Sequence, residues 1–193
     1  MMLENLKNKT IILGSQSPRR KQLLSGLGIE FEVEVRETDE YVDPSLSAPE
    51  AVRQIALQKV KAFTDKSDCL VICADTVVVS AAGEILGKPR TEAEAKQTLR
   101  NLSGQKHLVI TAVALQWRAV VHSFVETTSV YFHHLDQDEI DYYVTHFSPL
   151  DKAGSYGIQE WIGLIGIEKI EGEYNNVVGL PTARLYQELK KLT

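Results

Sequence analysis

Hydrophobic residues recur along this chain with two spacings, one typical of strands and the other of helices. Strand-like runs are predicted at residues 11–13, 31–35, 69–79, 84–86, 109–117, 120–133, 162–170 and 175–180. Helical spacing begins near Ser17, Ser47, Thr91, Asp136 and Pro181. Because helices alternate with strands and several neighbouring strands suit hairpins, we predict an α/β fold with a mixed, twisted sheet and flanking helices. No linker or internal repeat interrupts the pattern, which indicates one domain over residues 1–193.

The composition is typical of a soluble globular protein without a basic surface. Lys and Arg number 21 against 26 Asp and Glu, a net charge of −5, so general binding to nucleic acid is not expected. Met1–Lys9 lacks the apolar core of a signal peptide, and no run of about eighteen apolar residues predicts a membrane span. Cys69 and Cys73 would lie about 13 Å apart on one strand at ~3.3 Å per residue, too far for a disulfide. We therefore expect free thiols and a cytoplasmic protein.

The start of the first predicted helix breaks a rule of helix stability. Ser17 and Pro18 suit this position, because Ser caps a helix and Pro lacks the N–H that would be unpaired there. Arg19, Arg20 and Lys21 then crowd the first turn, where the helix dipole disfavours cations. A bound anion would reconcile this, since backbone N–H groups, the dipole and guanidinium groups all suit phosphate. The alternative is a solvated basic patch.

Asp75 interrupts the most apolar predicted strand, residues 69–79. A carboxylate there must be paired, bound to a metal or facing a cleft, unless it caps a turn at the strand end. Asp39 and Glu40 precede the second predicted helix; they would add oxygen ligands or be ordinary solvated carboxylates. Mg²⁺ needs only one or two carboxylates beside phosphate oxygens and water. Lys59, at the edge of the inward face of that helix, either reaches the interior or snorkels to solvent.

Several common catalytic motifs are absent from the sequence. Gly83–Lys88 resembles a phosphate-binding loop but is one residue short between its glycines, and Pro89 stands where Ser or Thr must bind Mg²⁺. The five histidines follow no zinc-binding pattern, and no Gly-x-Ser-x-Gly nucleophile elbow is present.

Six short motifs follow one another along nearly the whole chain. They are Ser15–Arg20 (SQSPRR), Ala74–Val78 (ADTVV), Gly87–Pro89 (GKP), Leu102–His107 (LSGQKH), Asp151–Gln159 (DKAGSYGIQ) and Val178–Pro181 (VGLP). In type and order they resemble the motifs of the Maf family, first described as septum formation inhibitors and understood as nucleoside triphosphate pyrophosphatases. One small departure is Gln16, where Gly is common in that family.

The resemblance implies a cytoplasmic enzyme that hydrolyses a nucleoside triphosphate to the monophosphate and pyrophosphate. Water would attack the α-phosphorus with the help of a divalent cation, Mg²⁺ or Mn²⁺. The resemblance also implies an elongated fold with two lobes around a central cleft, similar to inosine triphosphate pyrophosphatases and often present as a homodimer. By motif position, Asp75 would accept the proton of the attacking water, and Glu40 and Asp75 would contact the metal.

The remaining site residues are implied in the same way. Ser15, Arg19, Lys59 and Lys88 would hold the triphosphate. Arg20, Thr76 and Gln159 match the specificity positions of the subgroup that acts on dTTP and UTP, including modified pyrimidine nucleotides. A second subgroup prefers 7-methyl-GTP and carries other residues at those positions.

Two other functions stay open at the level of sequence. One is a nucleotide-binding regulator of cell division or septum formation without significant turnover. The other is a sugar-nucleotide or phosphosugar enzyme, which would also use an arginine-rich helix start. Asp75 favours an enzyme over a sensor, because a sensor needs no general base.

Overall fold

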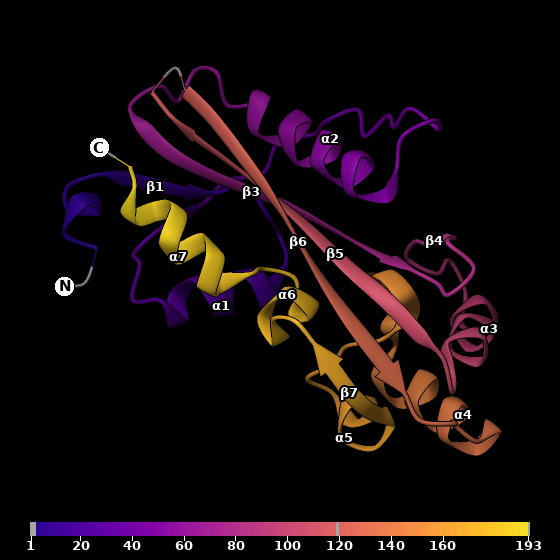
Figure 1. Ribbon diagram of the computed structural model, residues 1–193. Coiled ribbons are helices and arrows are strands. Elements are labelled where there is room, and N and C mark those ends of the chain that lie inside the picture. The colour runs from indigo at the N-terminus through magenta and orange to yellow at the C-terminus, as the bar shows by residue number, and fades with distance from the viewer. Residues whose placement is uncertain (1–2, 119, 193) are drawn as a thin grey trace. The chain divides into compact units, whose positions relative to one another are not determined.

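The computed structural model describes residues 3–118 and 120–192, which form a mixed sheet with flanking helices (Figure 1). The strands are β1 (Thr10–Leu13), β2 (Glu32–Val33), β3 (Cys69–Val79), β4 (Ile85–Leu86), β5 (Lys106–Trp117), β6 (Val120–Phe132) and β7 (Ile167–Glu171). Their order is β2-β1-β3-β5-β6-β7, with β4 paired to β3. β1 is parallel to β2 and β3, whereas β4 is antiparallel to β3 and β7 to β6. The predicted mixed α/β fold is confirmed.

Seven α-helices and three short 3₁₀ helices occur in the described part of the chain. They are η1 (Glu4–Leu6), α1 (Pro18–Gly26), α2 (Ala48–Lys61), α3 (Glu92–Leu102), α4 (Gln137–Phe147), η2 (Pro149–Asp151), η3 (Ala153–Ser155), α5 (Trp161–Gly166), α6 (Tyr174–Val178) and α7 (Thr182–Lys190). The predicted starts are confirmed: Ser17 and Thr91 cap α1 and α3, and capping boxes begin α2 and α4. Within the described residues, no helix has both the length and the hydropathy that crossing a membrane requires.

The chain divides into two compact units that share the three longest strands. Unit 1 contains Met1–Asp75, Thr111–Glu126 and Gly179–Thr193, and unit 2 contains Thr76–Ile110 and Thr127–Val178. The division therefore falls within β3, β5 and β6, and within β3 it separates Asp75 from Thr76. The expectation of a single domain over residues 1–193 stays a prediction.

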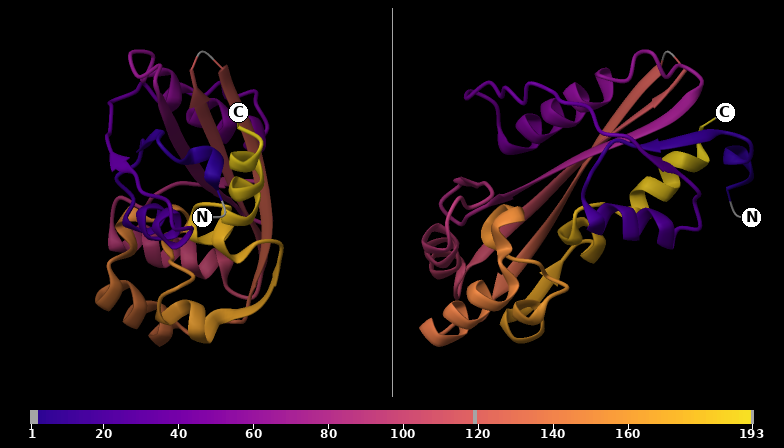
Figure 2. Two further views of the ribbon diagram at one scale, coloured as in Figure 1. Left: turned by 90° about the vertical axis from the view of Figure 1, so that its left-hand side faces the viewer. Right: turned by 180° about the vertical axis from the view of Figure 1, so that it is seen from behind.

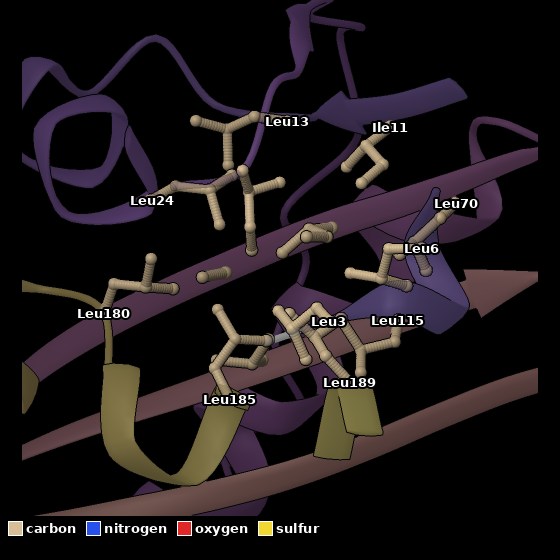
Figure 3. Close-up of a cluster of buried hydrophobic side chains, with 14 of the residues drawn as sticks. Leu3, Leu6, Ile11, Leu13, Leu24, Leu70, Leu115, Leu180, Leu185 and Leu189 are labelled. Atoms are coloured by element: carbon tan, nitrogen blue, oxygen red, sulfur yellow. The ribbon is translucent and has the colours of Figure 1, made fainter. Parts of the chain in front are cut away.

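Unit 1 is a sheet with helices on both faces. Side chains that alternate along β1 and β3, such as Leu13 and Ile72, pack against Leu24 of α1 and Leu185 of α7 in one buried cluster (Figure 3). The opposite face carries α2: Figures 1 and 2 show it across the strands from α1 and α7. Burial of these apolar side chains, each worth roughly 1.5–3 kcal/mol when complete, holds the carboxyl end of β1 and the start of α1 in place.

Gly14, which follows β1, leaves room for two side chains, one from β3 and one from the turn after α2, that pack closely against it. A Cβ at Gly14 would overlap Sγ of buried Cys73 and lie 3.2 Å from the ring of Phe63. Burial raises the pKa of the Cys73 thiol to about 12, so this sulfur is an inert packing group at neutral pH.

Gly14→Ala is expected to lower the free energy of unfolding by about 1–3 kcal/mol, because added volume in a packed core displaces its neighbours. Urea denaturation measures this directly. Gly26→Ala is the matched control, because nothing lies within 4 Å of its added Cβ. Ala has fewer accessible backbone conformations than Gly in the unfolded chain, so this variant should be as stable as the unaltered protein or up to ~1 kcal/mol more stable. Equal stabilities of the two variants would contradict the close approach at Gly14.

Unit 2 has a second core, formed mainly by side chains of α3, of α4 and of the parts of β3, β5 and β6 that belong to this unit. α3 and α4 pack together, and α3 also packs on η2 and η3. His107, Phe132 and Tyr156 meet edge to face with ring centroids 4.9–5.4 Å apart. These rings fix the middle of the segment 148–159, predicted as a glycine-bearing loop and found to contain two short 3₁₀ helices.

Three strand predictions need correction. Residues 162–170 were expected to be one strand, but Trp161–Gly166 is helix α5 and the strand β7 starts at Ile167. Residues 175–180 were expected to be a strand, but Tyr174–Val178 is helix α6. Both runs are short and apolar, a length at which periodicity does not separate helix from strand. The strand predicted at residues 31–35 is reduced to two exposed residues, Glu32 and Val33.

Candidate active site

The middle of β3 is partly exposed to solvent at its polar residues, Asp75 and Thr76. Residues 70–74 and 78–79 are buried, whereas Asp75, Thr76 and Val77 are half-buried. β1 ends beside Ile72, its neighbour in the parallel register, so β3 continues past the carboxyl end of β1. In α/β sheets this edge is where ligands commonly bind. Asp75 thus lies within the strand, beside the place where the polypeptide of β1 turns toward α1.

Two carboxylates converge on one ammonium group in unit 1. Nζ of Lys59, on α2, lies 2.6 Å from Oδ1 of Asp75 and 3.0 Å from Oε1 of Glu40. The side chains of Lys59 and Asp75 are about one-fifth exposed, and that of Glu40 is half exposed. Lys59 therefore reaches inward, which settles the alternatives left by its position at the edge of the helix face. Asp75 is paired rather than part of a turn.

This arrangement fits a divalent cation held in part by substrate. No group of three or more His, Cys, Asp or Glu side chains gathers anywhere in residues 3–118 and 120–192, so the protein offers no complete metal cage there. Asp75 and Glu40, each within contact of the same Lys59 nitrogen, supply the one or two carboxylates that Mg²⁺ requires when phosphates and water complete its coordination. The two side chains are therefore suitable ligands.

The segment between β1 and α1 is ordered by side-chain oxygens. Oγ of the buried Ser15 accepts a hydrogen bond from the N–H of Ser17 at 3.2 Å, and Oγ of Ser17 accepts from the N–H of Arg20 at 3.4 Å. Arg19 is half-buried in the first turn of α1. Backbone N–H groups and the positive end of the helix dipole suit this end of α1 to an anion.

Arg20 is turned toward the protein. Its Nε donates to the carbonyl of Gly179 at 2.9 Å, and its Nη1 donates to the carbonyl of Ala74 at 2.8 Å and to Oγ of Ser15 at 3.3 Å. Burial lowers the pKa of this guanidinium, and the charge of Asp75 opposes that shift. Arg20 thus connects α1 to the strand that carries Asp75, and its cation is compensated by backbone carbonyls despite its place in the first helical turn.

The other predicted site residues belong to unit 2. Thr76 follows Asp75 on β3, Lys88 is exposed after β4, and Gln159 is exposed at the end of the segment 148–159. The N–H of Gly154 donates to the carbonyl of Gly87 at 3.2 Å, which places that segment against the residues preceding Lys88. Gly154 has a φ of +71°, and a Cβ there would lie 2.8 Å from Val78.

A polar network absent from the predictions holds the segment 148–159 from within. The buried Lys152 pairs with Glu160 at 3.2 Å and with Asp151 at 2.7 Å. Glu160 accepts a hydrogen bond from the hydroxyl of Tyr143, which in turn accepts from the N–H of Gly157 at 2.9 Å. Desolvation raises the pKa of Tyr143 above its usual range, and Glu160 adds to this, so the hydroxyl stays a donor.

His107 anchors the same segment from β5. Its Nε2 lies 2.7 Å from the hydroxyl of Tyr156, and both side chains are buried. Burial lowers the pKa of His107 from 6.5 to about 4, so the imidazole is neutral at physiological pH.

Acid should therefore weaken the protein through His107. The neutral ring stabilises the fold fully above pH 6.5, and that contribution is lost as the pH falls toward 4, where protonation favours the unfolded chain. At ~1.36 kcal/mol per pH unit, the loss is about 3 kcal/mol. Urea unfolding of the protein and of His107→Gln should show a stability difference that narrows between pH 7 and pH 4. Parallel pH profiles would exclude this role.

Contacts between residues far apart in the sequence could not be predicted from local patterns. The carbonyl partners of Arg20, at Ala74 and Gly179, carry no side-chain signal that a pattern can show. Gln58 donates to the carbonyl of Tyr41 at 2.8 Å, and this too is invisible in periodicity. The Lys152–Glu160 pair could have been predicted, because Lys152 stands in a segment of mostly small and apolar residues and a buried charge needs a partner.

Comparison with solved structures places the fold in a known class. The chain superimposes on the Ham1 protein of Staphylococcus aureus with a TM-score of 0.50 at 16% identity, covering 93% of this chain and 100% of that one. It superimposes on a HAM1 protein from Coxiella burnetii with a TM-score of 0.52 at 15% identity, covering 95% of this chain and 100% of that one. The protein thus has the α/β fold of these Ham1 proteins, in agreement with the mixed α/β fold predicted from the sequence.

Sequence comparison then identifies the family. The family model described as Maf-like protein matches residues 10–192, and the chain belongs to the Maf family. A protein of Phocaeicola vulgatus named dTTP/UTP pyrophosphatase is 52% identical to this chain, over 99% of this chain and 100% of the relative. A Porphyromonas gingivalis protein of the same name is 48% identical, over 98% of this chain and 97% of the relative. A Bacteroides fragilis protein of the same name is 47% identical over 99% and 100%.

Proposed function

We propose that this protein is a nucleoside triphosphate pyrophosphatase that hydrolyses dTTP and UTP to the monophosphate and pyrophosphate. The observation that carries the proposal is the identity of 47–52% with enzymes of that name over essentially the whole chain. The geometry around Asp75 is compatible with this reaction, because it combines a carboxylate, a second carboxylate and a cation at one place. Modified pyrimidine nucleotides are included among the proposed substrates.

Within unit 1, each residue has a role that its surroundings support. Asp75 accepts the proton of the water that attacks the α-phosphorus, a task for which a carboxylate on a partly open strand is suitable. Ser15, Arg19 and Lys59 bind the triphosphate, where their hydrogen-bond donors offset its charge. Arg20, fixed by two backbone carbonyls, contributes to the choice of nucleotide.

Glu40 and Asp75 would hold a divalent cation, Mg²⁺ or Mn²⁺. When bound, such a cation neutralises charge on the phosphates and polarises their oxygens. In the structure the Lys59 ammonium contacts both carboxylates, so binding of cation and triphosphate together would let Lys59 pair with phosphate instead. For Lys88, Thr76 and Gln159 of unit 2, the support is the family pattern alone. A homodimer and a cytoplasmic location also stay predictions; the free thiols of Cys69 and Cys73 suit a reducing compartment.

A substrate screen in H₂¹⁸O tests the function and the point of attack together. The purified chain is incubated with Mg²⁺ and each common nucleoside triphosphate, with 5-methyl-UTP added, and pyrophosphate and monophosphate are quantified. We expect pyrophosphate from dTTP and UTP at the highest rates, with ¹⁸O in the monophosphate. Label in pyrophosphate would contradict attack on the α-phosphorus. Tight binding of dTTP without any product would instead support a nucleotide-binding regulator.

A further inference from the structure

Glu40 lies on a segment that has no regular structure of its own. Between β2 and α2, residues 34–47 form no helix or strand, and the Glu40 side chain is half exposed. Holding such a side chain in place costs conformational entropy, both of the backbone around it and of its own rotamers. The contact of Glu40 with Lys59 therefore calls for something that fixes the segment.

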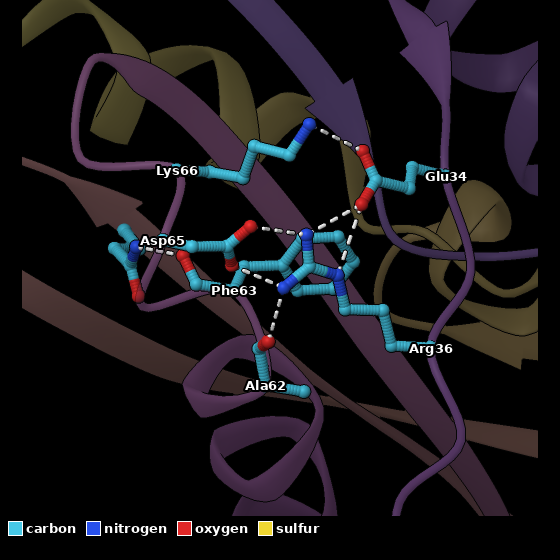
Figure 4. Close-up of polar contacts among 7 residues, drawn as sticks. Glu34, Arg36, Ala62, Phe63, Asp65 and Lys66 are labelled. Atoms are coloured by element: carbon cyan, nitrogen blue, oxygen red, sulfur yellow. Dashed lines mark hydrogen bonds and ion pairs between the residues drawn. The ribbon is translucent and has the colours of Figure 1, made fainter.

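Arg36, four residues before Glu40, ties this segment to the end of α2 (Figure 4). Its Nε and Nη2 donate to Oε1 of Glu34 at 2.9 and 2.6 Å. Its Nη1 and Nη2 donate to the carboxylate of Asp65, the second at 2.9 Å, and Nη1 also donates to the carbonyl of Ala62 at 2.6 Å. The guanidinium lies 4.5 Å from the ring centroid of Phe63. We call Glu34, Arg36 and Asp65 the Arg36 cluster.

The cluster is charged throughout the neutral pH range. Hydrogen bonding to Arg36 lowers the pKa of Asp65 to about 2, and Asp65 and Glu34 raise that of Arg36. Lys66 adds an ion pair to Glu34 at 2.9 Å. Only the planar fork of Arg can face two carboxylates and a carbonyl while lying on an aromatic ring, so Lys is a poor replacement.

Two hydrogen bonds join the irregular segment to α2, and they lie on either side of Glu40 in the segment and of Lys59 in the helix. On the irregular segment, Arg36 precedes Glu40 and Tyr41 follows it, with the Tyr41 carbonyl bound by Gln58 at 2.8 Å. On α2 and the turn after it, the partners Gln58 and Ala62 lie on either side of Lys59. The helix that carries Lys59 therefore also holds the segment that carries Glu40.

We propose that Arg36 is a positioning residue for Glu40: by fastening the segment before Glu40 to the end of α2, it keeps that carboxylate beside Lys59 and Asp75. The guanidinium of Arg36 binds Glu34, Asp65 and the carbonyl of Ala62. Its effect on Lys59 and Asp75 therefore passes through the segment that carries Glu40. The kinetic consequence rests on the proposed pyrophosphatase function, because it assumes that Glu40 assists the reaction. The ordering of the segment does not depend on that function.

Kinetics in a double-mutant cycle test the link between Arg36 and Glu40. Arg36→Ala is expected to lower kcat for dTTP about tenfold and to raise the Mg²⁺ concentration for half-maximal rate several-fold, with KM within about twofold, since small displacements of site groups cost rate strongly. In a Glu40→Gln background, the same change should have almost no further effect on kcat. Equal factors in both backgrounds would overturn the proposal.

Hydrogen–deuterium exchange gives a readout that needs no turnover. Arg36→Ala should speed exchange of peptides that cover residues 37–46 and leave those of α7 unchanged. The milder Asp65→Asn, at an exposed carboxylate, should do the same to a smaller extent, and Arg36→Lys should be intermediate. Unchanged exchange over 37–46 in these variants overturns the proposal. If the unaltered protein releases no pyrophosphate, the proposed function fails, and exchange still decides the role of Arg36.

Arg184→Ala is the matched control. Arg184, on α7, also donates to a backbone carbonyl, that of Val125 at 2.8 Å, pairs with Glu126 at 3.2 Å, and lies over an aromatic ring, that of Phe124. It thus loses the same kinds of contact within the same unit. We expect its kcat, Mg²⁺ dependence and exchange over 37–46 to match the unaltered protein. The same losses in Arg184→Ala would show a general effect on stability and overturn the specific role of Arg36.

Discussion

Asp75→Asn is expected to lower kcat for dTTP hydrolysis by about 10²–10⁴-fold, the usual contribution of a general base. The amide keeps the size of the carboxyl group, and its oxygen can still accept a hydrogen bond from Lys59, which lies 2.6 Å from Oδ1 of Asp75. It cannot accept the proton of the attacking water. KM for dTTP should change much less than kcat, because the groups proposed to bind the triphosphate remain.

The measurement is steady-state release of pyrophosphate at saturating Mg²⁺, with thermal unfolding to confirm the fold. Asp68→Asn is a suitable control, since Asp68 is an exposed Asp just before the same strand. Its kcat should equal that of the unaltered protein. Turnover of Asp75→Asn near the unaltered rate would remove Asp75 from the reaction and require another base.

Glu160→Gln is expected to have the largest effect on stability among single polar changes, a loss of about 2–4 kcal/mol. The change leaves the ammonium of Lys152, only 9% exposed, without its partly buried partner. Removing one member of a buried ion pair is costly because the other charge stays desolvated. Asp151 remains paired with Lys152 at 2.7 Å but is itself more than half exposed, so it compensates only in part.

Urea unfolding of Glu160→Gln, Lys152→Met and the double variant measures the coupling between the two charges. The double variant should be more stable than the sum of the two single losses predicts, since no isolated charge remains. Glu171→Gln serves as control: its pair with Lys169 is exposed on both sides, and because solvent screens such surface pairs, the stability should stay close to that of the unaltered protein. Strict additivity of Lys152 and Glu160 would show that they do not act as a pair.

Elements with strong local signals were predictable from the sequence. β3 has the predicted bounds, since eleven mostly apolar residues flanked by polar ones leave few other choices. The helix starts at Ser17, Ser47 and Thr91 follow from side chains that satisfy nearby N–H groups. Asp75 could be singled out because a carboxylate within such a strand requires a partner.

What could not be predicted depends on which distant groups meet. The apolar run that contains α5 presents Leu164 at 82% exposure, and only the tertiary fold decides that this residue faces outward. Arg36 stands in a stretch of alternating charges, and nothing in that stretch points to Asp65, 29 residues later. The pairing of Lys59 with Asp75 was left open for the same reason.

The long-range contacts of unit 1 have a consequence for the order of events during folding. The core of unit 1 joins Leu6 to Leu185 and Leu189, and Asn5 donates hydrogen bonds to the carbonyls of Leu189 and Leu192. Unit 1 thus needs α7 before its core is complete, and the hydrogen bond from Asn5 to Leu189 joins residues 184 positions apart. Contacts so distant in sequence close a long loop before they contribute stability, so the packing of α7 against the N-terminal residues is expected to be a late step of folding.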